Sequence, residues 1–283
     1  MKFHFPYFFS LFLLLIFSCQ PFSDQEFRLP KGYDLETRTQ IDLPKKLREI
    51  SGIAWYKDEI LAIEDENGVI YQLDPKSGEI LNELKFGKPG DYEDILIHED
   101  EAWILRSDGA IFQVKNPLEN AVEINQFNFE RKGQRDFETL LALPNQGKLL
   151  LICKDCSWDK RQEASIFELD LETGRFSDDF LGKISTKKED LPKGNGIKRT
   201  LGSQPSAVAV HPLTAEVFLI SSAGKWLMIL DQNLIPKEIY ELNPQLFNQP
   251  EGITFDPRGN LYISNEGGRG KPNLLFLPYK LDN

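Results

Sequence analysis

An internal repeat is the feature of this sequence that most restricts what it can fold into. Five segments share one pattern: an apolar strand, a turn rich in Asp, Pro, Asn or Gly, a second apolar strand, another polar turn and a third strand. The equivalent positions, separated by 42, 45, 68 and 45 residues, are Gly52, Asp94, Thr139, Ala207 and Gly252. A period of about 45 residues is typical of the four-stranded blades of a β-propeller.

The pattern predicts an all-β chain, because no long stretch shows helical periodicity. We expect a single β-propeller of four-stranded blades, with five blades from the five units. A sixth, degenerate blade within the 68-residue interval is the alternative. The last unit has only three strands and stops near Leu277, so the segment "TRTQIDL" from Thr37 is expected to add its outer strand and close the ring.

The N-terminus carries a targeting segment. An apolar run from Phe5 to Phe17 is shorter than a typical membrane-spanning helix and is typical of a secretory signal. The run ends at Cys19 in "IFSC", which resembles a bacterial lipobox, where cleavage accompanies lipidation of the Cys thiol. We therefore expect residues 1–18 to be a lipoprotein signal peptide, residues 19–36 the lipidated Cys19 with a polar tether, and residues 37–283 the propeller.

Two alternatives for the N-terminus are an ordinary signal peptide and an N-terminal anchor helix. A lipid anchor would attach the chain to a membrane of the cell envelope, facing the periplasm or the cell exterior. The formal net charge of −11 argues against nucleic acid as the main partner, because phosphate contacts need clustered Lys and Arg. The same charge is compatible with a bound cation.

The other two cysteines stand in "CKDC". Cys153 and Cys156 form an even pair, which in an exported protein could close a small disulfide. The alternative is two half-buried thiols at the end of a strand. A lone pair of cysteines is a weak zinc signal, because a zinc site needs further ligands.

Oxygen-bearing side chains recur at two strand ends that the repeat places on one face, around the mouth of the central channel. Each innermost strand begins with acid, amide or hydroxyl residues, and most of the second strands end in similar ones. Crowded carboxylates repel one another, and Ca²⁺ typically compensates them through about six to eight oxygen ligands. The candidate calcium ligands are Glu93, Glu138, Glu251, Asp65, Asn265 and Glu266.

Basic and hydroxyl residues at the same face are candidates for contacts with a small anionic ligand; they are Arg106, Lys154, Ser206 and Arg199. Arg106 and Lys154 could instead pair with Glu93 and Glu138 and leave no metal site. In a third interpretation the polar groups only cap strand ends and solvate the channel. Nucleophilic catalysis finds little support, because His98 and His211 lie in turns on the opposite face.

Several motifs together resemble the SdiA-regulated domain family of exported or membrane-tethered bacterial β-propellers. They are "REISGIAW", "EDENGVIYQLD", "GDYEDI", "QPSAVAVHP" and "QPEGITFDPRGNLYISNE", and the resemblance covers roughly Leu43 to Tyr279. It implies a Ca²⁺ site at the channel mouth, with Glu93, Glu138 and Glu251 at the repeated acidic position. Ser51 and Ser206 hold that position in the first and fourth units, so the site would be lopsided.

The resulting expectation for function is a binding or interaction module. A lipid-anchored propeller would hold calcium or a small polar ligand at its channel mouth, and its rim would meet another envelope protein. The alternatives are a calcium-dependent phosphoesterase of the phytase type and a lactonase-like hydrolase, which the fold alone does not distinguish. The units with Ser at this position argue against phosphate hydrolysis by several calcium ions, because that reaction would need carboxylates at more of the strand ends.

Overall fold

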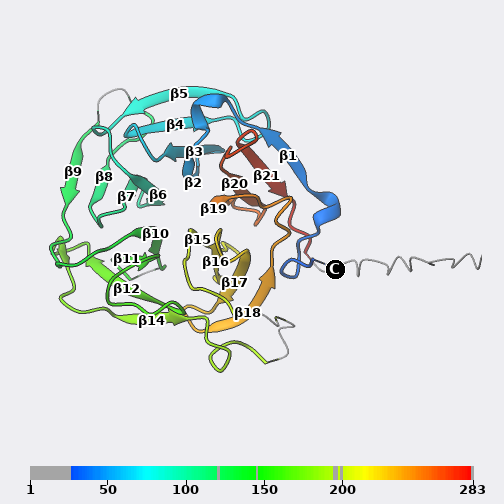
Figure 1. Ribbon diagram of the computed structural model, residues 1–283. Coiled ribbons are helices and arrows are strands. Elements are labelled where there is room, and N and C mark those ends of the chain that lie inside the picture. Colours follow the sequence, from blue (N-terminus) through cyan, green and yellow to red (C-terminus); the bar gives the residue numbers. More distant parts are fainter. Residues whose placement is uncertain (1–26, 120–121, 145, 194–196, 198–199, 282–283) are drawn as a thin grey trace, which may run out of the picture.

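Five β-sheets stand around a central axis and form a closed ring (Figure 1). The computed structural model describes residues 27–119, 122–144, 146–193, 197 and 200–281. Within them the only helices are two single turns, η1 (Leu35–Thr37) and η2 (Lys45–Leu47). No helix among these residues has the length and apolar character that a membrane crossing requires. The fold is therefore the predicted all-β propeller with five blades.

Each blade is an antiparallel sheet, and in the first four blades the strands follow one another outward from the channel in chain order. The first blade consists of β2 (Ile50–Tyr56), β3 (Glu59–Glu64), β4 (Val69–Leu73) and β5 (Ile80–Lys85), and the second of β6 (Tyr92–His98), β7 (Glu101–Arg106), β8 (Ile111–Val114) and β9 (Ile124–Phe127). The third contains β10 (Phe137–Ala142), β11 (Lys148–Cys153), β12 (Glu163–Asp170), β13 (Arg175–Phe176) and β14 (Gly182–Ser185). The fourth consists of β15 (Ala207–Val210), β16 (Val217–Ser221), β17 (Trp226–Leu230) and β18 (Pro236–Glu241).

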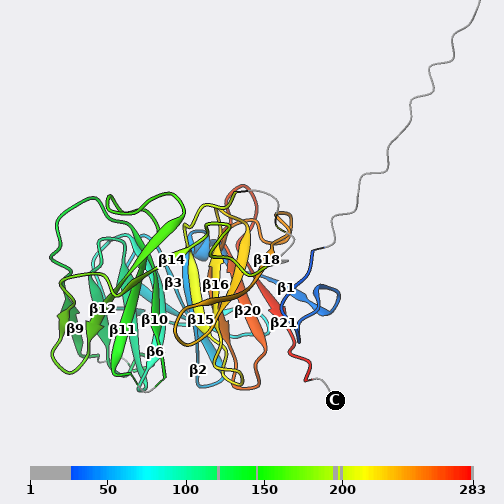
Figure 2. The same ribbon diagram turned by 90° about the horizontal axis from the view of Figure 1, so that it is seen from below.

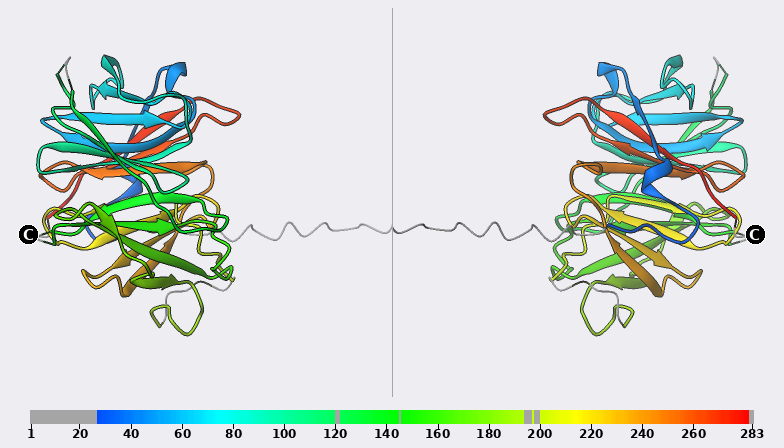
Figure 3. Two further views of the ribbon diagram at one scale, coloured as in Figure 1. Left: turned by 90° about the vertical axis from the view of Figure 1, so that its left-hand side faces the viewer. Right: turned by 90° about the vertical axis from the view of Figure 1, so that its right-hand side faces the viewer.

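The fifth blade joins the two ends of the described chain. It contains β19 (Pro250–Phe255), β20 (Leu261–Asn265) and β21 (Asn273–Leu277), and its outer strand is β1 (Thr39–Asp42). The register pairs Thr39 with Phe276 and Asp42 with Asn273. Figure 3 shows the blue β1 beside the red β21. The predicted closure of the ring by an N-terminal strand is confirmed.

The long interval before the fourth unit does not hide a sixth blade, so that alternative is wrong. β13 and β14 both pair with the same edge of β12: Asp170 lies opposite Arg175, and Glu163 lies opposite Ser185. The outer position of the third blade is thus one strand interrupted by a short loop. The extra residues lengthen this edge and the loop that leads into β15, and they form no separate sheet among the described residues.

The hydrophobic core of the described chain lies in the five seams between neighbouring blades. In β17, for example, Trp226 and Met228 pack toward the third blade, whereas Leu227 and Ile229 pack toward the fifth. Because side chains alternate between the two faces of a strand, a blade buried on both faces needs apolar residues at every position. This explains uninterrupted apolar runs such as "WLMIL" at residues 226–230.

Polar side chains also join the blades near the channel. Asp94 Oδ2 accepts a hydrogen bond from the backbone N–H of Leu140 in the next blade at 2.8 Å. Thr254 Oγ1 accepts one from the N–H of Trp55 at 2.9 Å. An innermost strand has a free edge, so these side chains satisfy backbone donors that no strand can reach. The channel therefore has a fixed geometry at both of these seams.

Every blade presents the start of its innermost strand and the end of its second strand at the same face of the disc (Figure 2). The pairing of Tyr92 with Arg106 and of Phe137 with Cys153 shows this directly. The hairpin turns at the other ends of these strands lie on the opposite face. Residues from five separate parts of the sequence thus meet at one channel mouth.

Candidate functional site

A β-bulge interrupts four of the five innermost strands at the same position. The register skips one residue between Ile50 and Gly52, between Tyr92 and Asp94, between Phe137 and Thr139, and between Pro250 and Gly252. The extra residues are Ser51, Glu93, Glu138 and Glu251. A bulge releases its extra residue from the alternation of the strand and redirects its side chain, often beside a functional site. The repeated acidic position of the sequence is therefore a repeated bulge.

The fourth blade differs at this position. Ser206 lies just before β15, and its N–H donates to the carbonyl of Ile220 at 2.8 Å. Its hydroxyl donates to the carbonyl of Pro250 in the fifth blade at 2.8 Å and accepts from the N–H of Ser222 at 3.0 Å. Ser206 thus joins two blades beside Glu251, a candidate calcium ligand.

Three carboxylates meet where the second and third blades adjoin. Oxygen atoms of Glu93, Asp136 and Glu138 all lie within 4.8 Å of one another. Glu138 is only 5% exposed, and its Oε2 has no hydrogen-bond partner in the described structure. A buried carboxylate oxygen without a partner is costly unless a donor or a cation reaches it. These three residues, which we call the acidic cluster, are the best-defined candidate for a cation site.

The electrostatics of the acidic cluster are those of negative charges held close together out of water. Burial, reinforced by the charges of Asp91 and Asp136, raises the pKa of Glu93 to about 9, against the opposing charge of Lys154. Burial also raises the pKa of Asp136, again opposed by Lys154. At neutral pH Glu93 therefore holds a proton that a cation would displace.

The acidic character continues along the fifth and first blades. Burial raises the pKa of Glu266 to about 7, together with the charges of Glu251, Glu49 and Asp65. Burial and the charge of Glu49 raise the pKa of Asp65 to about 6, and Asp65 Oδ1 is a second buried carboxylate oxygen without a partner in the described structure. Glu266 also accepts a hydrogen bond from Gln249 Nε2 at 2.6 Å.

Glu251 is electrostatically coupled both to Lys154, which pairs with Glu138 of the acidic cluster, and to Glu266. Burial raises the pKa of Glu251, while a hydrogen bond from Ser222 and the charges of Lys154 and Lys225 oppose the rise. Five of the predicted ligands are thus coupled electrostatically to one another or to Lys154: Glu93, Glu138, Glu251, Asp65 and Glu266. We call this wider set, with Asp136, the acidic collar.

Lys154 is the basic residue that pairs with the acidic cluster. Its ammonium group forms an ion pair with Glu138, as one sequence-based alternative expected. Its charge also opposes the burial-driven rise in the pKa of Glu93, Asp136, Glu251 and Glu266. The acidic cluster therefore contains one internal cation as well as three carboxylates.

Two other predicted residues, Arg106 and Asn265, make hydrogen bonds outside the collar. Arg106 makes a two-pronged ion pair with Asp108, at 2.9 and 2.8 Å, and lies over the ring of Phe112. Asn265 Nδ2 donates to the carbonyl of Leu246 at 3.3 Å and to Asn273 Oδ1 at 3.0 Å, while its own Oδ1, the atom that could bind a cation, is buried without a partner in the described structure. Both side chains tie neighbouring segments together. Arg199 and Cys19 lie outside the described residues.

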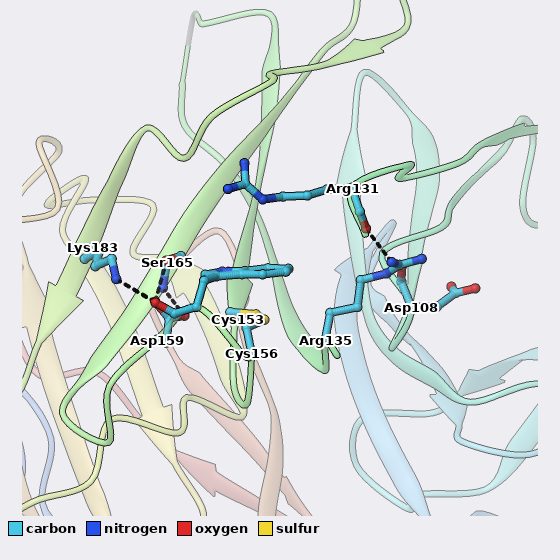
Figure 4. Close-up of a disulfide and its surroundings, with 9 residues drawn as sticks. Asp108, Arg131, Arg135, Cys153, Cys156, Asp159, Ser165 and Lys183 are labelled. Atoms are coloured by element: carbon cyan, nitrogen blue, oxygen red, sulfur yellow. Dashed lines mark hydrogen bonds and ion pairs between the residues drawn. A yellow bond between two sulfur atoms is a disulfide. The ribbon is translucent and has the colours of Figure 1, made fainter. Parts of the chain in front are cut away.

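Cys153, the last residue of β11, and Cys156 are paired as a disulfide (Figure 4). Their Cα atoms are 6.1 Å apart, within the usual range for such a bridge. The loop that they close contains Lys154 and Asp155, whose N–H groups both donate to the carbonyl of Asp136, at 2.8 and 3.2 Å. The loop that the bridge closes is thus hydrogen-bonded to the backbone of a residue of the acidic cluster.

Two residues of the site were not among the predicted ones: Asp136 of the collar, and Ser222, which hydrogen-bonds to Glu251. Asp136 occupies the same place in its unit as Asp91, two residues before the bulge, so a recurring acid was a signal for it. His98 and His211 lie at the opposite face, as predicted from the strand count. His211 Nδ1 accepts from the N–H groups of Leu213 and Thr214, at 3.2 and 3.1 Å, which is a turn-stabilising role.

Five antiparallel sheets around a channel with an acidic mouth define a β-propeller with a candidate cation site. The chain belongs to the SdiA-regulated family, whose sequence model matches residues 29–277. No curated protein matches the chain.

Solved structures with a similar fold have distant sequences. The glutaminyl cyclase of Myxococcus xanthus has a TM-score of 0.55 and 12% identity over 87% of this chain and 96% of its own. A luciferin-regenerating enzyme has a TM-score of 0.55 and 9% identity over 85% of this chain and 95% of its own. The hydrazine synthase of Kuenenia stuttgartiensis has a TM-score of 0.50 and 11% identity over 83% of this chain and 84% of its own. At such low identity these likenesses show the fold alone.

Proposed function

We propose that this chain is an exported, lipid-anchored propeller of the cell envelope that binds calcium at its channel mouth. The observation that carries the proposal is the acidic cluster: three carboxylates within 4.8 Å of one another, one of them a buried glutamate with an unpartnered oxygen. The anchor and the envelope location rest on the apolar run and "IFSC" at Cys19.

The residues fit a hard divalent cation. Glu93, Asp136 and Glu138 offer carboxylate oxygens, which Ca²⁺ prefers, and no thiol or imidazole belongs to this group. When bound, calcium would offset the burial and the neighbouring negative charges that now raise the pKa of Glu93 and Asp136. The protein would then hold a fixed positive centre in its channel mouth, beside which a small anionic ligand or a loop of an envelope protein could bind.

Binding is favoured over catalysis by the arrangement of the basic residues. A phytase-like phosphoesterase would need cationic groups free to hold phosphate, whereas Arg106 is paired with Asp108. Lys154 is likewise engaged by Glu138. The first and fourth blades contribute Ser51 and Ser206 in place of carboxylates, which leaves fewer metal ligands than a multi-calcium hydrolase would use.

Calcium titration monitored by thermal melting tests the proposal, because a ligand that binds only the folded state raises the melting temperature. At a hundred times the dissociation constant the gain is about 2.7 kcal/mol, or about 5 to 10 °C for a domain of this size. The protein used would begin after Cys19. Magnesium at the same concentration should raise the melting temperature less, because Mg²⁺ loses its water reluctantly.

The matched variants are Glu93→Gln/Asp136→Asn/Glu138→Gln, which removes the acidic cluster, and Glu123→Gln, which removes an exposed carboxylate paired with Lys115 at the outer edge of the second blade. We expect the calcium-induced shift to disappear in the first and to remain in the second. An equal shift in both, or none in the unaltered protein at millimolar calcium, would refute the site. Release of phosphate from inositol phosphates by the calcium-loaded protein would instead establish the phosphoesterase alternative.

A further inference from the structure

Lys154 contacts the carboxylate that most needs a partner. Its ammonium group pairs with one oxygen of the buried Glu138, whose other oxygen has none. Glu138 belongs to the acidic cluster, so the ammonium group lies beside the place that a divalent cation would take. Positive charges this close repel strongly, because the buried surroundings screen them less than bulk water does.

The position of Lys154 is set by a short covalent loop. Cys153 ends β11 and Cys156 follows three residues later, so the disulfide closes a loop whose two inner residues are Lys154 and Asp155. Both cysteines are buried. The backbone N–H of Lys154 donates to the carbonyl of Asp136 at 2.8 Å, which ties the loop to the acidic cluster itself.

The exit of this loop is held by a buried acid. Asp159 Oδ2 accepts from the N–H of Ser165 at 2.9 Å, and its Oδ1 accepts from the hydroxyl at 2.5 Å. Lys183 forms an ion pair with Asp159 at 2.9 Å (Figure 4). β11 fixes one end of the loop and Asp159 fixes the other, so the disulfide removes freedom mainly from Lys154 and Asp155.

We propose that Lys154 is a built-in competitor for the cation site and that the Cys153–Cys156 disulfide holds it there. This inference rests on the proposed function. The ammonium group and a divalent cation compete for the same carboxylates, so Lys154 sets the calcium affinity of the collar. Opening the disulfide loosens the loop and weakens the competitor, and the affinity for calcium then rises.

The redox step is the ordinary exchange between a dithiol and a disulfide. A dithiol reductant gives two electrons and two protons to the bridge, so the S–S bond breaks, Cys153 and Cys156 become thiols, and the reductant becomes a disulfide. The relevant chemical class of reductant is therefore a protein or small-molecule dithiol. Its action changes no charge in the collar and alters only how firmly Lys154 is held.

The first test is calorimetric titration of the full domain with calcium. Lys154→Gln should bind calcium about tenfold or more tightly, as expected when one charge is removed within ion-pair distance. Lys154→Arg, which keeps the charge, should bind like the unaltered protein. Lys148→Gln is the matched control, because Lys148 lies at the far end of β11 and pairs with Glu168; it should change nothing.

The second test adds the dithiol dithiothreitol. Reduction should tighten calcium binding several-fold in the unaltered protein and leave Lys154→Gln unchanged, because the competitor is already absent there. An equal effect of reduction on both proteins, or no effect on either, overturns the role of the bridge. Equal calcium affinity of Lys154→Gln and the unaltered protein overturns the role of Lys154, while no calcium binding by any of them overturns the proposed function itself.

A melting experiment in calcium-free buffer separates these outcomes further. Lys154→Gln leaves Glu138 without its ion pair and should lower the melting temperature of the oxidised protein. The loss should be smaller in the reduced protein, in which Lys154 is held less firmly. A loss of the same size in both redox states would show that the bridge does not position Lys154, whatever the protein does with calcium.

Discussion

At the scale of single residues, the molecule concentrates buried acids at one end of its channel. Glu93, Glu138, Asp136 and Asp94 all lie within or beside the second and third blades, and each has a distinct environment. Asp94 is fully engaged by two backbone donors, whereas Glu138 keeps one oxygen unpartnered. The first arrangement is structural and the second is suited to a ligand.

The raised pKa values of the collar predict how stability depends on pH. Between about 4.5 and the raised values, about 9 for Glu93 and about 7 for Glu266, the folded protein binds more protons than the unfolded chain. Stability must therefore fall as pH rises through this window. We expect the melting temperature in calcium-free buffer to decrease from about pH 5 to about pH 9.

Two comparisons make the pH effect specific to the collar. Glu93→Gln should flatten the decrease, because the variant has no carboxyl group to ionise at that position. Saturating calcium should flatten it as well, since the cation replaces the protons. A slope that is the same in Glu93→Gln and in the unaltered protein would place the effect elsewhere.

Asp94 gives a prediction of stability alone. Asp94→Ala leaves the N–H of Leu140 in the neighbouring blade without its acceptor, which costs about 1 to 3 kcal/mol. Urea denaturation should show this loss, while Asp94→Asn, which keeps a side-chain oxygen, should lose less. The calcium affinity should change far less than in Lys154→Gln, because both Asp94 oxygens already bind backbone donors.

At the scale of elements, a bulge near the start of an innermost strand presents one acidic side chain at the channel mouth. In a regular strand that starts at Tyr92, the side chain of Glu93 would point into one of the two apolar seams beside the blade. The extra residue lets the following Asp94 and Ile95 keep their places in the seam while Glu93 turns to the mouth. Equivalent bulges place Glu138 and Glu251. An acidic residue can therefore face the mouth without moving the following apolar residues out of the core.

Substitution of Gly52 tests how closely the innermost strands of the first two blades pack. A Cβ at Gly52 would lie 2.9 Å from the Cα of Asp94 and 2.9 Å from the backbone nitrogen of Ile95. Gly52→Ala should therefore push the first two blades apart and cost about 1 to 3 kcal/mol. Gly182→Ala in β14, where a Cβ meets nothing within 4 Å, is the control that should be neutral by denaturant titration.

The strands and the face that carries the collar were predictable from the sequence, whereas several side-chain pairings at the mouth were not. The repeat located every innermost and second strand, because both faces of a blade are buried and the apolar runs are therefore strong. It also brought Glu93, Glu138 and Glu251 to one face. It could not show that Arg106 chooses Asp108 over Glu93, or that Asn265 bonds to Asn273, because such choices depend on side-chain neighbours in space.

At the scale of the whole molecule, five seams and one closing strand hold the ring. Each innermost strand contacts the innermost strands of both neighbouring blades, so that no blade is free of the others. β1 completes the fifth blade by pairing with β21. Asp42 of β1 also forms an ion pair with Lys271 at 2.8 Å, at the start of β21.

Removal of the closing strand should destabilise the whole domain. A protein that begins after Asp42 lacks β1, so the edge of β21 is exposed and its backbone groups lose their partners. We expect a lower melting temperature and a tendency to associate, measured by light scattering. A protein that begins at Phe27 keeps every described contact of β1 and serves as the comparison.

The β1–β21 pairing also sets an order of events during synthesis. The chain is made from its N-terminus, so the strand that seals the fifth blade is the first to appear and must wait for its partner, which is the last. Pairings between such distant segments form slowly. The nascent chain therefore spends most of its elongation with an unsealed ring, and any factor that shields an open strand edge at that stage would act on β1.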